Sequence, residues 1–91
     1  MNKQLARAIA DIIRNKWNPS IGVLSSDEIY QELSRRGVRV PEGDMRQIFD
    51  AFVNAGVLGG QKVVDRDAVK QNGAILITSV TWELLDELNF D

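Results

Sequence analysis

The sequence LSSDEI at residues 24–29, together with NAGVL at residues 54–58, decides the fold of this chain. Ser25 and Glu28 are three residues apart, the spacing at which each side chain can bond a backbone N–H at a helix start. Gly56 is the residue type best able to take the left-handed conformation just beyond a helix. The region therefore predicts a capped helix, a second helix that ends at Gly56, and a strand directly after it.

Two helices are predicted within this region, over residues 26–36 and 42–55. The first places Ile29 and Leu33 on its buried face, with Tyr30 beside them, and ends before Gly37. Pro41 suits the first turn of a helix, so it is expected at the start of the second. The second helix has one core face, because its apolar residues follow the spacing i, i+3, i+4, i+7 and i+8: Met45, Ile48, Phe49, Phe52 and Val53.

The other predicted elements lie on both sides of this helix pair. Residues 2–17 show apolar residues at helical spacing and predict a first helix, and residues 21–24 predict a brief strand. Residues 57–64 predict a strand with a bulge or twist point at Gly59-Gly60, and residues 74–77 predict the returning strand. Thr78 or Thr81 is expected to cap a fourth helix, which carries Trp82, Leu84, Leu85 and Leu88.

Composition indicates one globular domain of the α+β class over residues 1–91. Apolar residues make up 44% of the chain and charged residues 26%, which is ordinary for a soluble protein. No apolar run is long enough to span a bilayer, and Arg7 and Asp11 interrupt any signal-peptide core, so we expect a cytoplasmic protein with no membrane partner. The chain has no cysteine and no histidine. It therefore lacks disulfides, thiolate metal ligands and the commonest general base.

Enzymatic patterns are also missing from the sequence. Ser25 and Ser26 have no histidine to activate them and are better explained as helix caps. Gly59-Gly60 lacks the spacing of a phosphate-binding loop. Asp65 and Asp67 alternate as in a calcium loop, but no glutamate follows at the required position. We expect no catalytic activity, no cofactor and no metal site.

The charges are distributed unevenly along the chain. The formal net charge is −2, from 11 basic and 13 acidic residues. Four carboxylates lie in the last nine residues, which contain no lysine or arginine. The first 82 residues therefore carry 11 basic and nine acidic groups. Dedicated DNA-binding domains usually show a stronger basic stripe, because phosphate neutralisation supplies most of their sequence-independent affinity. The balance alone therefore does not identify a nucleic-acid partner.

The predicted order of helix, short strand, two helices, strand, wing, strand and helix resembles the winged helix-turn-helix superfamily over nearly the whole chain. Residues 54–58 are similar to the junction between the recognition helix and the first wing strand. Residues 77–85 are similar to the pattern hydrophobic-Thr-x-x-Gly-x-x-x-Leu that precedes the last helix of small bacterial and prophage members. In this chain Thr81 takes the place of the glycine. The resemblance implies a three-helix core, a short strand, a β-hairpin wing and a C-terminal fourth helix.

The same resemblance implies that double-stranded DNA is the partner and that residues 42–55 form the recognition helix. Arg46 is then a candidate for pairing with guanine, Gln47 or Asn54 with adenine, and Asp50 with cytosine. Six basic residues are candidates for phosphate contacts around that helix and in the wing: Arg35, Arg36, Arg39, Lys62, Arg66 and Lys70. The alternative for both sets is a solvated surface of mixed charge, whose ion pairs contribute about 0–1 kcal/mol each.

The last helix is unusually apolar for an element at a chain end. Trp82, Leu85 and Phe90 are candidates for a homodimer or partner contact through the first and last helices. The alternative is that these residues complete the core. A regulatory DNA-binding protein is the favoured function, and a winged helix that binds another protein, without nucleic acid, is the alternative.

Overall fold

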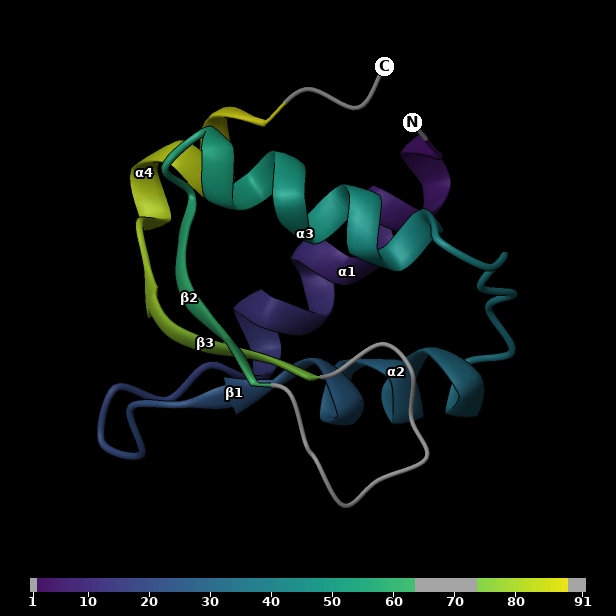
Figure 1. Ribbon diagram of the computed structural model, residues 1–91, viewed down its shortest axis with the longest axis horizontal. Coiled ribbons are helices and arrows are strands. Elements are labelled where there is room, and N and C mark those ends of the chain that lie inside the picture. The colour runs from purple at the N-terminus through teal and green to yellow at the C-terminus, as the bar shows by residue number, and fades with distance from the viewer. Residues whose placement is uncertain (1, 64–73, 89–91) are drawn as a thin grey trace.

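The computed structural model describes residues 2–63 and 74–88, and of residues 61–63 and 74 it describes the backbone alone. These residues form an α+β domain of four helices and a three-stranded antiparallel sheet, which confirms the predicted class (Figure 1). The elements in chain order are α1 (Lys3–Lys16), β1 (Leu24–Ser25), α2 (Ser26–Arg35), α3 (Asp44–Asn54), β2 (Leu58–Val63), β3 (Ala74–Val80) and α4 (Trp82–Glu87).

Strand β3 is the central strand of the sheet, whose order is β1-β3-β2. Leu24 pairs with Ile77 on one side, and Leu58 pairs with Val80 on the other. The register shifts between Gly59 and Gly60, which confirms the predicted bulge. The predictions were wrong on two strands: β1 begins three residues later than expected and ends one residue later, and β3 continues three residues beyond Ile77. Strand residues form only where a partner strand lies opposite. Pairing with β3 therefore limits β1 to two residues, and pairing with β2 extends β3 to Val80.

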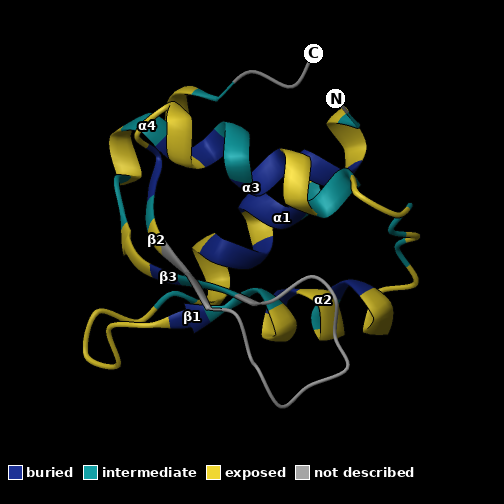
Figure 2. Ribbon diagram, in the orientation of Figure 1, coloured by how far each residue is buried: buried dark blue, intermediate teal, exposed yellow. Residues whose placement is uncertain are grey.

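Helix α1 lies between α2 and α3 and contacts both, with the sheet along the side of this group (Figure 1). Its apolar face is fully buried, as the predicted helical spacing requires (Figure 2). The core continues through α2, α3, β3 and α4, and its large, fully buried members include Ile29, Leu33, Ile48, Phe49, Phe52, Ile77. Within the described residues no buried side-chain nitrogen or oxygen lacks a hydrogen-bond partner. The fold is therefore stabilised chiefly by apolar burial.

The ends of α2 follow the predicted chemistry. The Ser25 side chain caps the helix by accepting a bond from the backbone N–H of Asp27 at 3.1 Å, one residue before the predicted donor. At the other end Gly37 takes φ +74, and the N–H of Val38 bonds the carbonyl of Leu33 at 2.9 Å. This bond closes a Schellman turn, which ends the helix as expected. The same pattern ends α3 at Gly56.

The predicted start of α3 was wrong by two residues. The helix begins at Asp44, and Gly43 precedes it in the left-handed conformation at φ +83. Pro41 therefore lies before the helix, in a turn closed by a bond from the N–H of Asp44 to its carbonyl at 3.2 Å. Tyr30 and Val53, which were expected in the core, are 50% and 38% exposed. Each residue lies at the edge of the apolar face of its helix, where the position of the neighbouring elements decides whether a side chain is covered.

The second serine of the LSSDEI sequence has a role that the cap pattern does not reveal. The Ser26 hydroxyl accepts a hydrogen bond from the backbone N–H of Ile75, a residue of β3, at 3.0 Å. The ladder between β1 and β3 ends one pair earlier, at Ser25 and Leu76. The hydroxyl thus replaces the next backbone acceptor of the ladder. It also joins the first residue of α2 directly to the central strand.

We expect Ser26→Ala to lower the free energy of unfolding by about 1–3 kcal/mol, because the half-buried N–H of Ile75 loses its acceptor. Ser34→Ala is a matched control, since it removes an exposed hydroxyl from the same helix. Its effect should stay within about 0.5 kcal/mol. Urea denaturation followed by circular dichroism measures both. Equal stabilities for the two variants would show that this bond does not contribute.

Candidate nucleic-acid interface

The outward face of α3 carries one continuous stripe of side chains. Ile48, Phe49 and Phe52 point into the core, so the helical repeat turns the intervening positions away from it. Arg46, Gln47, Val53 and Asn54 are exposed there, and Asp50 is half-buried. We call these five residues the α3 stripe. The structure thus brings all four predicted base-contact candidates onto one face.

Val53 is the member of the stripe that sequence analysis missed. It is 38% exposed, although its spacing from Met45 predicted a core position. The same residue lies seven positions after Arg46, which is two helical turns along the outward face. That spacing was a signal available in the sequence. The stripe therefore combines a cation, two amides and a carboxylate with one small apolar side chain.

The charge of the stripe depends on Arg46 and Asp50. Arg46 forms no ion pair with another described residue. Carboxylates also lie at the start of α3, where Glu42 is exposed and Asp44 accepts a bond from the Asn2 amide at 3.3 Å. Negative charge at this end complements the helix dipole. It also lowers the attraction of this end of the helix for phosphate.

The two arginines at the end of α2 are engaged in ion pairs. Arg36 bonds Asp11 of α1 at 2.8 Å and Glu32 at 3.3 Å. Glu32 also pairs with Arg35 at 3.2 Å and with Lys16 of α1 at 3.8 Å. We call these five residues the α1–α2 ion cluster. Three cations share two carboxylates in it, so two of the six predicted phosphate contacts, Arg35 and Arg36, are paired within the chain.

The hydrogen bond from Arg36 to Asp11 raises the pKa of the guanidinium, and Glu32 adds to the effect. A raised pKa in the folded state stabilises the protein at every pH below it. Arginine is already protonated throughout the ordinary pH range. The contribution of Arg36 to stability is therefore not lost through its own titration near neutral pH, but salt screens it.

Arg39 is the predicted phosphate contact that remains available. It lies in the connection between α2 and α3, is exposed, and forms no ion pair with another described residue. The other three predicted contacts fall outside what the structure describes: Arg66 and Lys70 entirely, and the side chain of Lys62. Arg39 before α3 and Arg46 in its first turn are therefore two cations that form no ion pair within the part of the chain that the structure describes.

The predicted partner contacts on α4 divide between core and surface. Leu85 is 2% exposed and belongs to the core, which is the alternative expected for these residues. The short helix α4 directs this side chain into the hydrophobic core. Trp82 is 40% exposed, and Phe90 lies outside the described residues. Arg14 of α1 pairs with Asp86 at 2.5 Å, so α1 and α4 are also linked within a single chain.

Two features of the described residues bear on other kinds of site. They contain no group of three or more acidic, histidine or cysteine side chains placed to hold a metal ion. None of the helices in residues 2–63 and 74–88 is long and apolar enough to cross a membrane. In comparisons with known proteins, no family model, curated protein or solved structure matches the chain.

We expect Arg36→Gln to lower the melting temperature at low salt, because it removes the link between Asp11 and Glu32. The deficit should shrink in about 1 M NaCl, where the Debye length is about 3 Å. Arg46→Gln is the control, since Arg46 has no ion pair with a described residue to lose. Differential scanning calorimetry at both salt concentrations measures the effect. A deficit of the same size at both would contradict an ionic role.

Proposed function

We propose that this chain is a winged helix-turn-helix protein that binds double-stranded DNA through α3. The observation that carries the proposal is the α3 stripe, which presents Arg46, Gln47 and Asn54 together on the outward face of the second helix of a helix pair. Each of these side chains can make paired hydrogen bonds to a base edge in a major groove. A surface helix is also the element that a major groove accommodates.

The arrangement of the other elements supports the same proposal. The short strand β1 precedes the helix pair, and the hairpin of β2 and β3 follows it, in the order expected of a winged helix. In the proposed complex the segment between β2 and β3 is the wing. Lys62, Arg66 and Lys70 are in or beside that segment and would contact phosphates. Arg39 would do so from the turn before α3.

Each position of the stripe has a proposed role in the groove. Arg46 would pair with guanine, and Gln47 or Asn54 with adenine. Asp50 would accept a bond from the amino group of cytosine and would repel phosphate elsewhere. Such an arrangement favours a base-specific role over general DNA binding, because the stripe carries little net charge. A cytoplasmic regulator that binds as a homodimer is the biological role most consistent with it.

A second function is favoured by the charge around α3. Residues 39–54 carry two arginines and three carboxylates, and Val53 adds exposed apolar surface. A helix of this composition also suits a groove on another protein, where charged residues surround apolar contacts. The second candidate is therefore a winged helix that binds a protein through the same stripe and makes no contact with nucleic acid.

A selection of bound sequences from a random duplex pool in about 0.05 M salt, followed by fluorescence anisotropy, tests the first proposal. We expect an enriched site, and we expect Arg46→Gln to weaken binding to it by about tenfold, since a bidentate base contact contributes about 1–3 kcal/mol. Arg14→Gln is the control, because it removes the same charge from α1, where Arg14 is paired with Asp86. Its effect should stay within about twofold.

The two candidate functions give opposite results in this experiment. Absence of binding to any duplex at low salt would refute the DNA proposal. Binding that both arginine variants weaken equally would show a general electrostatic attraction instead of a contact through the stripe. In the first case the protein-binding candidate stands.

A further inference from the structure

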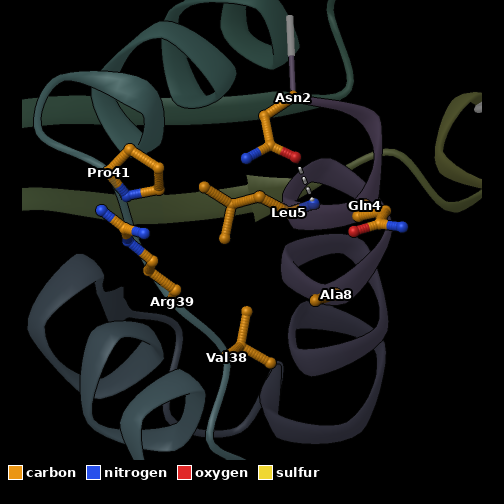
Figure 3. A pocket seen from close by; sticks show the side chains of 7 residues that line it. All are labelled: Asn2, Gln4, Leu5, Ala8, Val38, Arg39 and Pro41. Carbon is orange, nitrogen blue, oxygen red and sulfur yellow. Dashed lines mark hydrogen bonds between the residues drawn. The ribbon is translucent and has the colours of Figure 1, made fainter.

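A hollow of about 390 Å³ lies between the first half of α1 and the connection that joins α2 to α3 (Figure 3). Its volume is near the lower end of the range for small-molecule sites, roughly 300–1,000 Å³. Most of its wall is apolar. Leu5 and Ala8 line it from α1, and Val38 and Pro41 line it from the connection. An apolar group of modest size can therefore be covered on two sides.

Asn2, Gln4 and Arg39 are the polar residues that line the hollow, and Asn2 and Arg39 differ in whether they are already bonded. Asn2 is occupied on both sides of its amide, since its oxygen accepts from the N–H of Leu5 at 3.1 Å and its nitrogen donates to Asp44 at 3.3 Å. Arg39 lies on the connection side, with its guanidinium toward Pro41 (Figure 3). It forms no ion pair with another described residue. The hollow thus offers one available cation beside an apolar wall.

We propose that this hollow is a binding site for a small carboxylate with a short aliphatic body. The carboxylate would pair with the guanidinium of Arg39, whose planar group of donors matches two carboxylate oxygens. The aliphatic body would lie against Leu5, Ala8 and Val38. A dianion is disfavoured, because Asp44 lies beyond Asn2 on the same side of the domain and Arg39 is the cation that the hollow supplies.

The site is placed where a ligand would contact two elements at once. Asn2 caps α1 and also bonds Asp44, the first residue of α3. A ligand that spans from Ala8 to Arg39 would therefore lie beside the link between α1 and α3. Arg39 is one of two cations near the start of α3 that form no ion pair with a described residue. Occupation of the hollow would neutralise it.

Isocaproate is the probe for this proposal, and its neutral amide, isocaproamide, is the matched ligand that lacks the charge. The protein over residues 1–91 is titrated without nucleic acid, so the result does not depend on the proposed function. The methyl resonances of Ala8 and Val38 report binding in ¹H–¹³C spectra. We expect saturable shifts with isocaproate, and much smaller ones with the amide at the same ionic strength.

Three variants test whether the guanidinium of Arg39 is the group that binds the carboxylate. Arg39→Gln should weaken binding of isocaproate by about fivefold, and Arg39→Lys should restore part of it. Arg46→Gln is the control, because it removes another exposed arginine, one that does not line the hollow, and should leave the affinity for isocaproate unchanged. The proposal is overturned if isocaproate causes no saturable shift, if the amide binds equally well, or if the two glutamine variants behave alike.

Discussion

The pairing of β3 with strands on both of its sides is the interaction on which the rest of the structure depends. Leu24 and Ile77 are 53 residues apart in the chain, yet they lie opposite each other in the sheet. This contact fixes where α2 begins, and the hydroxyl of Ser26 extends it by one more bond to Ile75. On the other side β2 follows directly from α3. The helix pair is therefore attached to one strand at both of its ends.

Local chemistry made much of this fold predictable. Gly37 and Gly56 end their helices because the following backbone N–H groups turn back to bond helical carbonyls, and this depends on a few neighbouring residues. The bulge at Gly59-Gly60 could be predicted because two adjacent glycines inside a strand pattern indicate one. The position of β1 could not, because it is decided by strand partners far along the chain. Pro41 alone did not predict the start of α3, because Gly43 takes the left-handed conformation and the helix begins only at Asp44.

The candidate site shows the same division between local and distant causes. Helical periodicity correctly predicted that Arg46, Gln47 and Asn54 share the outward face of α3. Val53 was misplaced because its position borders both faces of the helix. The state of Arg36 was not readable from the sequence, since its partner Asp11 lies 25 residues earlier on another helix. Ion pairs of this kind depend on how helices pack.

These ion pairs change how the surface charge of the molecule has to be understood. Counting basic residues in the sequence suggests a positive patch beside α3, but Arg35 and Arg36 pair with Glu32, and Arg36 also links α2 to Asp11 of α1. Among the described residues, the charge left for an anionic partner near α3 comes from Arg39 and Arg46. Two cations give little general attraction for a duplex. Any affinity for DNA would therefore have to come from base contacts or from the segment between β2 and β3. Neutralising Arg39 would remove one of the two positive charges that α3 and its preceding turn contribute.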